Sequence, residues 1–305
     1  MGPLEDSLTT EALNPRSAEI DRLGARGIVD LMALEDREAL RAVADEAAAI
    51  ARAVDLAADR FRRGGRLIYA GAGTSGRLGV LDASECPPTF NSPPGMVVGL
   101  IAGGHTALTR AVEGAEDDPE AGADDLRALG LTADDLVVGI ASSGRTPYVL
   151  GAVDEARRVG ATTVGIACNR PSVLGGRVDL EIALVVGPEI LAGSTRLKSG
   201  TATKLVLNMI STGAMVLIGK TYGHRMIDLQ PTNHKLRLRT RRILRELAGI
   251  DDEAAARLLE RSGGKLKVAL VAALAGVDPD RAAILLDAHG GQVRLAVSAS
   301  TEGLR

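Results

Sequence analysis

The middle of the chain alternates short, mostly apolar runs with longer segments of helical spacing. The five runs lie at residues 66–70, 96–101, 136–141, 162–168 and 180–186. Continuous apolar runs of this length are typical of strands buried on both faces of a sheet. Because helix-sized stretches separate the runs, the pattern predicts an α/β fold with a doubly wound parallel sheet over residues 60–222.

The segment before the first run has the spacing of a helix. Apolar residues recur every three to four positions over residues 36–62, and Gly64-Gly65 follow directly. This pattern predicts one long helix that ends at the glycines, preceded by a polar tail that ends near Pro15. We therefore expect residues 1–59 to form an N-terminal helical segment.

The region beyond Tyr222 has helical spacing and no strand-like run. Residues 249–270 can be laid over 276–297 at an offset of 27, with nine identities in 22 positions. The identical pairs are Gly249/Gly276, Asp251/Asp278, Ala255/Ala282, Ala256/Ala283, Leu258/Leu285, Leu259/Leu286, Gly263/Gly290, Gly264/Gly291 and Ala269/Ala296. The alignment predicts a duplicated helix-GlyGly-helix unit within a small C-terminal helical domain, residues 223–305. Its two copies should pack together or on a partner subunit, because one copy cannot bury its apolar face alone.

Composition and charge narrow the possible partners. The 305 residues include 36 Lys plus Arg and 39 Asp plus Glu, for a net charge of −3, which argues against a nucleic-acid partner. The two cysteines make no disulfide framework, which favours a reducing compartment, and neither has the spacing of a metal ligand. The longest uncharged helical run, residues 205–219, is shorter than the ~20 residues of a membrane span. We expect a cytoplasmic protein with no membrane partner and no bound metal.

Glycine and hydroxyl residues gather in three clusters. The first, residues 71–76, follows the first apolar run and has the spacing GxGxxG; the second, residues 142–147, follows the third run. The third, residues 193–201, precedes a helix expected over 202–219. A dinucleotide site would need a carboxylate about 20 residues after the first cluster, where Asn91 stands. Hydroxyls beside a helix N-terminus serve either as ordinary caps, as expected for Thr146 before Pro147, or as an anion site. Two clusters fall at the carboxyl ends of predicted parallel strands, where such sheets bind ligands, so the pattern favours a phosphorylated small molecule.

Two acidic segments are candidates for proton transfer. Glu85 lies just before Pro87-Pro88, which predict that its helix stops near Glu85 and that the helix dipole disfavours the charge, as suits a general acid. Further on, four acids fall within residues 113–118, and the last two, Asp117 and Asp118, precede Pro119 as a turn and a helix cap would. The residue pattern alone does not select one catalytic acid among them.

Four motifs resemble those of the N-acetylmuramic acid 6-phosphate etherases, a branch of the sugar isomerase (SIS) domain proteins. They are GAGTSGRLGVLDASECPPT at 71–89, AVEGAEDD at 111–118, SGRTPYV at 143–149 and GSTRLKSGT at 193–201. Their order and spacing match over nearly the whole chain. The resemblance implies a SIS fold, a homodimer and no metal or cofactor. It also implies a carbon-oxygen lyase that cleaves the lactyl ether of N-acetylmuramate 6-phosphate, a step in the recycling or catabolism of cell-wall amino sugars.

The resemblance also implies the residues of the site. Glu85 and Glu116 are the expected catalytic pair: Glu85 protonates the departing lactate oxygen and activates water, and Glu116 handles the C2 proton, although the two roles could be exchanged. The residues expected to bind the sugar phosphate are Gly73, Thr74, Ser75, Ser142, Ser143, Gly144, Arg145, Thr146, Ser194, Thr195 and Lys198.

Two other functions fit the same fold and stay open at this point. An aldose-ketose isomerase acting on a hexosamine phosphate also removes a proton at C2, but it needs no acid at C3. A sugar-phosphate sensor without catalysis would keep the serine loops and tolerate the loss of Glu85 and Glu116.

Overall fold

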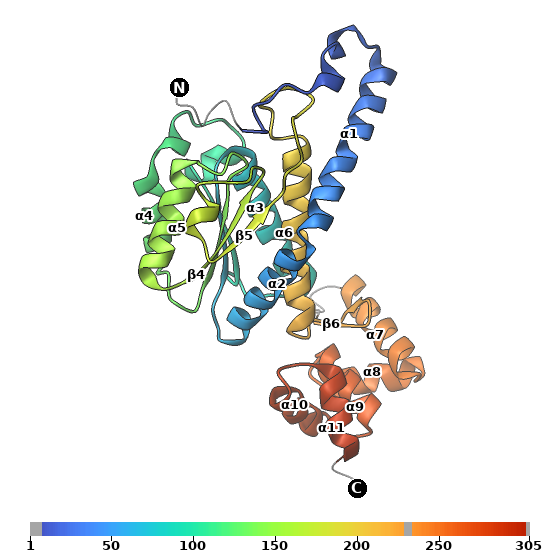
Figure 1. Ribbon diagram of the computed structural model, residues 1–305. Coiled ribbons are helices and arrows are strands. Elements are labelled where there is room, and N and C mark those ends of the chain that lie inside the picture. Colours follow the sequence, from blue (N-terminus) through green and yellow to red (C-terminus); the bar gives the residue numbers. More distant parts are fainter. Residues whose placement is uncertain (1–7, 229–233, 303–305) are drawn as a thin grey trace. The chain divides into compact units, whose positions relative to one another are not determined.

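The computed structural model describes residues 8–228 and 234–302 (Figure 1). Contacts divide the chain into two compact units: Met1–Ser84 with Gly95–Ser211, and Glu85–Pro94 with Thr212–Arg305. We call them the first and the second unit. The predicted boundaries at residues 59 and 222 stay a prediction.

The first unit is built on a parallel five-stranded sheet with the order β2-β1-β3-β4-β5. The strands are β1 Leu67–Gly71, β2 Val97–Ile101, β3 Leu136–Ile140, β4 Thr162–Ala167 and β5 Leu180–Ala183. All five predicted runs are therefore confirmed as strands. After β1 the chain builds β2 on one side and then returns to build β3 on the other, so the loops that follow β1 and β3 flank the switch point of the sheet.

Helices cover both faces of this sheet. Ile68 and Ala70 pack with Leu126 of α4, Pro119–Ala128, and Ala152 of α5, Pro147–Val159. On the opposite face α3, Gly73–Phe90, packs against β1, since a Cβ on Gly79 would lie 2.8 Å from Tyr69 Cβ. The helix α6, Lys198–Leu217, is hydrogen-bonded to α3 on the same side. The predicted doubly wound α/β fold is confirmed.

A buried carboxylate ties the second of these faces together. Asp82 of α3 accepts hydrogen bonds from the Tyr69 hydroxyl of β1 at 2.8 Å, from Asn208 at 2.7 Å and from Ser211 at 3.1 Å. The last two residues belong to α6. A buried charge is stable only when donors surround it, so this contact fixes both helices against β1.

The predicted helix over residues 36–62 is wrong in its start and in its continuity. The structure has two helices, α1 Ala25–Asp45 and α2 Ala47–Arg62, which are separated at Glu46. No residue of α1 before Glu35 is buried, so this part of the sequence lacks the pattern of a helix packed on a core. Glu46 breaks the helix where its carboxylate accepts a hydrogen bond from the Ala183 amide of β5 at 3.3 Å.

The second unit contains the predicted helical repeat. Its elements are β6 Thr221–Tyr222, β7 Arg225–Met226, α7 His234–Ala248, α8 Asp252–Arg261, α9 Leu266–Ala275, α10 Pro279–Ala288 and α11 Val293–Glu302. Asp251 and Asp278, which are equivalent in the repeat, accept N-cap hydrogen bonds at the starts of α8 and α10. Ala269 and Ala296, also equivalent, lie fully buried in one shared core. The repeated segments form two helix pairs that pack against each other. The expectation of no strand beyond Tyr222 is wrong, because β7 lies there; a strand of two residues leaves no recognisable run in the sequence.

Short 3-10 helices complete the secondary structure: η1 Pro15–Ser17, η2 Ile20–Arg22, η3 Gly104–Leu108, η4 Ala115–Asp117 and η5 Gly175–Arg177. Over residues 8–228 and 234–302, no helix has both the length and the apolar character needed to cross a membrane.

The edge of the sheet opposite the serine loops is closed by one ion pair. Asp135, 1% exposed, accepts hydrogen bonds from the Arg66 side chain at 2.7 and 3.0 Å and from the Arg66 and Thr132 amides at 2.9 Å. Burial by itself raises the pKa of Asp135, but the bonds from Arg66 and Thr132 outweigh it and hold the pKa below its usual value.

We predict that Asp135→Asn lowers the free energy of unfolding by about 3 kcal/mol, because it leaves Arg66 without its buried partner. Urea unfolding measures the change. Because the folded-state pKa is lowered, the carboxylate stabilises the fold above about pH 4, and this contribution is lost as the pH falls through the folded-state pKa. The difference between wild type and variant should therefore shrink in acid. Asp59→Asn, which removes an exposed partner of Arg63, is the control and should cost less than about 1 kcal/mol.

Candidate active site

The first glycine cluster turns β1 directly into α3. A Cβ on Gly76 would lie 2.6 Å from the Gly71 carbonyl oxygen, so these two glycines allow the strand and the helix to close on each other. Gly73 differs from them: its φ is +53° and a Cβ there would meet no atom within 4 Å. Gly73, Thr74 and Ser75 form the first turn of α3, where backbone N–H groups favour an anion.

The second cluster follows β3. The Ser142 carbonyl accepts hydrogen bonds from the Cys168 amide at 2.9 Å and from the Asn169 side chain at 3.0 Å. The Ser143 hydroxyl accepts a bond from the Arg145 amide at 3.3 Å, and Gly144 has a φ of +72°. Thr146 is the N-cap of α5 and Pro147 its first residue, as predicted, but the Thr146 side chain makes no capping bond. Its hydroxyl is thus not used to cap the helix.

The third cluster leads into α6, which begins at Lys198, earlier than expected. The first amides of this helix donate to a residue outside the cluster: the buried Glu189 carboxylate accepts from Lys198 N at 3.0 Å and from Ser199 N at 2.9 Å. Ser194 and Thr195 lie half-buried just before the helix. The capping of these amides therefore comes from Glu189, a residue that the sequence pattern did not single out.

Lys198 lies in a buried ion pair. Its Nζ donates to Glu35 Oε2 of α1 at 2.8 Å, and the two side chains are 2% and 3% exposed. Asn14 and Arg16 donate to the same carboxylate at 2.7 and 2.8 Å. Burial raises the pKa of Glu35, but the donors Lys198, Arg16 and Asn14 outweigh it and lower the pKa below its usual value. The Lys198 ammonium is thus held by Glu35, and its predicted contact with a phosphate stays a prediction.

Contacts between the clusters bring them to the same edge of the sheet. A Cβ on Gly200, in the first turn of α6, would lie 3.6 Å from Thr74 Cγ2. The buried Cys168 thiol contacts the hydroxyls of Ser142, Ser199 and Thr203, and its burial raises its pKa to about 11. The first turn of α6 therefore meets the loops that follow β1 and β3, at the switch point of the sheet.

The segment before η1 also lies at this edge, where the sequence predicted only a polar tail. The Thr9 amide and hydroxyl both donate to Asn169 Oδ1 at 2.9 Å. The Gly193 amide donates to the Thr10 carbonyl at 3.2 Å. Polar residues that bond to distant loops leave no periodic pattern, so this docking could not be predicted.

A cavity of about 220 Å³ opens beside the first cluster. Its lining residues are Ala72, Gly73, Arg77, Ala102, Ala107, Ala111, Val112, Glu113, Gly114, Ala115 and Glu116. The cavity therefore brings together the open glycine of the first turn of α3, one guanidinium and two carboxylates. These are groups that bind an anion and groups that move a proton.

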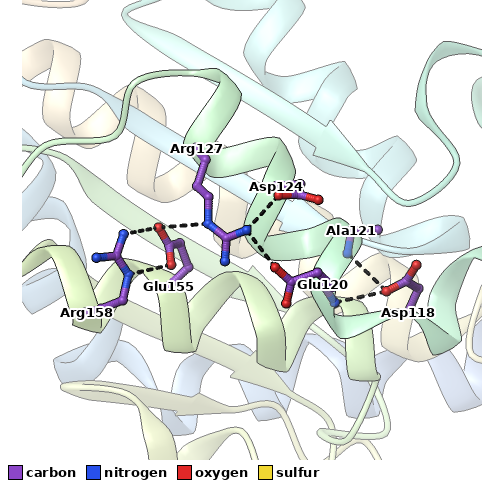
Figure 2. Close-up of polar contacts among 7 residues, drawn as sticks. All are labelled: Asp118, Glu120, Ala121, Asp124, Arg127, Glu155 and Arg158. Atoms are coloured by element: carbon purple, nitrogen blue, oxygen red, sulfur yellow. Dashed lines mark hydrogen bonds and ion pairs between the residues drawn. The ribbon is translucent and has the colours of Figure 1, made fainter.

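The structure separates the roles of the acids at residues 113–118. Asp118 is the N-cap of α4, as predicted, and accepts hydrogen bonds from the amides of Glu120 and Ala121 (Figure 2). Further along α4, Arg127 contacts Glu120, Asp124 and Glu155 of α5 (Figure 2). Glu113 and Glu116 differ from these acids, since both are exposed and line the cavity.

Arg77 lines the cavity and was not predicted from the sequence. It lies one turn after Gly73 on α3, and its Nε donates to the Leu108 carbonyl at 3.2 Å, which orients the guanidinium beside the cavity. A signal was present, since an arginine one turn beyond a phosphate-type glycine turn lies on the face of the helix next to the ligand.

The expected helix stop at Glu85 is wrong. α3 continues through Pro87-Pro88 to Phe90, and the Asn91 amide still donates to the Pro87 carbonyl at 2.9 Å. The helix ends at Asn91, whose φ of +50° is the left-handed conformation common after helices. Glu85 is exposed and lies more than a turn before this end, so the helix dipole gives no reason for it to be an acid.

Metal ligands show no grouping in the part of the chain that the structure describes, where no cluster of three or more His, Cys, Asp or Glu side chains could hold an ion.

Comparisons with known proteins agree on one family. Residues 49–157 match the model of the glucokinase regulatory protein N-terminal SIS domain, and residues 118–213 match the SIS domain model. The N-acetylmuramic acid 6-phosphate etherase of Rhodopirellula baltica is 58% identical over 266 residues, which cover 87% of this chain and 88% of that protein. That of Streptomyces coelicolor is 56% identical over 295 residues, which cover 88% and 95%. The chain belongs to the N-acetylmuramic acid 6-phosphate etherase family.

Proposed function

We propose that the protein cleaves the D-lactyl ether of N-acetylmuramate 6-phosphate, giving N-acetylglucosamine 6-phosphate and D-lactate in the recycling or catabolism of cell-wall amino sugars. The observation that carries this proposal within the structure is the cavity in which Gly73, Arg77 and Glu116 meet. Family membership supports the choice of substrate.

The reaction needs a base and an acid on one open-chain sugar. The C2 proton lies next to the aldehyde, so a carboxylate can remove it, and the C3–O bond breaks as the lactate oxygen takes up a proton. Water then adds to the resulting double bond: its oxygen joins C3, and a proton returns to C2. Each positioned acid or base contributes about 10²–10⁴-fold to such a step. Glu116 lines the cavity and suits removal of the C2 proton. For Glu85, the support is the motif at residues 71–89, which resembles that of the family and assigns Glu85 to the lactate oxygen.

The phosphate of the substrate fits the edge where the three clusters meet. Ser75 of the first turn of α3 and the loop residues Ser143 and Thr146 carry hydroxyls there, and no atom lies within 4 Å of a Cβ built on Gly73. The other residues predicted to bind the sugar phosphate, Thr74, Ser142, Gly144, Arg145, Ser194 and Thr195, belong to the same three loops.

Arg77 suits the carboxylate of the lactyl group. A guanidinium binds a carboxylate through two parallel hydrogen bonds, and the bond from Nε to the Leu108 carbonyl holds it in place. Of the groups on the substrate, the lactyl carboxylate is absent from N-acetylglucosamine 6-phosphate. Arg77 would therefore distinguish the substrate from its sugar product.

We also propose a cytoplasmic homodimer. The first half of α1 has no buried residue, although Val29 and Leu34 are apolar and are 60% and 45% exposed. Apolar side chains along an uncovered helix suit packing against a second copy. Cys86 and Cys168 are buried and neither is in a disulfide, which suits a reducing compartment.

The central prediction is that the purified protein releases D-lactate from N-acetylmuramate 6-phosphate. Glu116→Gln should lower kcat by about 10²–10⁴-fold, because the amide cannot take the C2 proton, and should leave KM nearly unchanged. Glu85→Gln should do the same. Glu120→Gln, an exposed acid of α4, is the matched control and should keep full activity. Ketose formed from glucosamine 6-phosphate without any lactate release would instead make the protein an isomerase.

The role of Arg77 has a separate test. Arg77→Ala should raise KM for N-acetylmuramate 6-phosphate at least about tenfold, which corresponds to the loss of a charge-assisted contact. Its affinity for N-acetylglucosamine 6-phosphate, measured by competitive inhibition, should stay within about twofold. Arg110→Ala, an exposed residue near the same cavity, is the control. Equal weakening of both ligands by Arg77→Ala would contradict the assignment.

The position of Lys198 leads to a double-mutant test. If the ion pair with Glu35 is its main role, Lys198→Met and Glu35→Gln should each cost about 3 kcal/mol of unfolding free energy. The pair Lys198→Met with Glu35→Leu should cost less than the sum of the single changes, since no charge is left buried alone. A stable Lys198→Met variant with a large rise in KM would show that the lysine binds the phosphate instead.

A further inference from the structure

The second unit contains a larger cavity that the proposed reaction does not use. Its volume is about 650 Å³. The residues that line it are Asn91, Ile227, Asp228, Gly263, Gly264, Lys265, Leu266, Lys267, Val268, Ala283, Leu286, Asp287 and Gly291. The glycines belong to the two GlyGly turns of the helical repeat, so both copies contribute to one hollow.

Two lysines share one carboxylate at this cavity. Lys220 Nζ lies 2.6 Å from Asp228 Oδ2, and Lys267 Nζ lies 3.6 Å from the same oxygen. The side chains of Lys220 and Lys267 are only 14% and 15% exposed. Among the described residues, no second carboxylate lies within ion-pair distance of either ammonium, so the three groups carry a net charge of +1.

This arrangement destabilises the charged form of Lys267. Burial lowers the pKa of Lys267, and Lys220 adds to the effect, while Asp228 opposes it. Lys267 is also the second residue of α9, where the helix dipole disfavours a cation. Its ammonium lies close to the second GlyGly turn, since a Cβ on Gly291 would be 3.4 Å from Nζ. A cation held against burial, dipole and like charge gains stability when an anion enters beside it.

The repeat provides an internal comparison. Residue 294 is equivalent to residue 267 at the offset of 27, and Arg294 lies over the Tyr222 ring at 4.8 Å from its centroid. In the second copy a ring face thus satisfies the basic residue. In the first copy Lys267 instead lines a cavity and shares the Asp228 carboxylate with Lys220, which suits a ligand better than a packing role.

We propose that this cavity binds a small phosphorylated metabolite, with its phosphate group at Lys267, beside the ion pair of Asp228 and Lys220. A phosphate matches the site better than a carboxylate, because its charge approaches −2 and therefore offsets more of the excess positive charge of Lys220, Asp228 and Lys267. The volume leaves room for an organic group of sugar size against Val268, Ala283 and Leu286. The second unit would then be a ligand-binding body, a role beyond the proposed etherase reaction.

Nuclear magnetic resonance of the full chain, labelled with ¹⁵N and deuterated, tests this with inorganic phosphate as the probe. The amides of Gly263, Gly264 and Gly291 report on this cavity, and those of Gly73 and Gly144 report on the candidate active site. Phosphate should shift the first group, and acetate at equal concentration should shift it far less. Lys267→Met should raise the half-saturating phosphate concentration for this group at least about tenfold. Lys204→Met, an exposed lysine of α6, matches the change in net charge and should leave it unchanged.

A second variant should change phosphate binding in the opposite direction. Asp228→Asn removes the competing carboxylate and should lower the half-saturating phosphate concentration several-fold, an effect that a purely structural role of Asp228 would not give. The proposal is overturned if phosphate leaves Gly263, Gly264 and Gly291 unshifted, if acetate acts equally, or if Lys267→Met binds as wild type does. Since lactate release is measured separately, either result leaves the etherase assignment unaffected.

Discussion

The close approach of Gly71 to Gly76 is the constraint on which the arrangement of the candidate site depends. A single Cβ on Gly76 would overlap the Gly71 carbonyl and the Ile101 side chain at 2.6 Å, so any other residue would push α3 away from the sheet. Because both residues are glycine, the helix starts within two residues of the strand end. Gly73 then lies in the open, Arg77 follows one turn later at the cavity, and Asp82 reaches Tyr69 and α6.

Buried carboxylates show why composition alone could not identify the site. Glu35, Asp82, Asp135 and Glu189 are nearly inaccessible, and each is surrounded by donors of the chain itself. A carboxylate buried in this way is out of reach of a substrate, and moving a proton onto it would break contacts that hold the fold. Glu116 has the opposite properties, since it is exposed and lines a cavity with an anion-binding turn.

Much of the fold follows from local pattern and was predictable for that reason. A strand buried on both faces needs an unbroken apolar run, and a duplicated unit repeats its caps, so the five strands and the Asp251 and Asp278 caps could be predicted. The same holds for Asp118 before Pro119. The wrong predictions concern segments whose structure depends on long-range contacts. The break at Glu46 depends on its contact with β5. The helix α3 continues through Pro87-Pro88 because the two prolines remove only two amide donors, while Cys86 and Phe90 stay buried. Sequence motifs named Glu116 and the three loops, but only the folded chain places Arg77 beside them and turns Lys198 toward Glu35.

The equivalent basic residues of the repeat, Lys267 and Arg294, have different surroundings, and this difference connects the sequence duplication with function. After a duplication both copies begin with the same contacts, and each position is then free to keep a packing role in one copy and gain another in the other. Arg294 over Tyr222 requires nothing beyond the chain itself. Lys267 is held with Lys220 around one carboxylate, an arrangement that packing alone would not favour, because an uncharged side chain of similar length would remove the repulsion at no cost in volume. The asymmetry between equivalent positions thus separates a residue that stabilises the unit from one that a bound anion would explain.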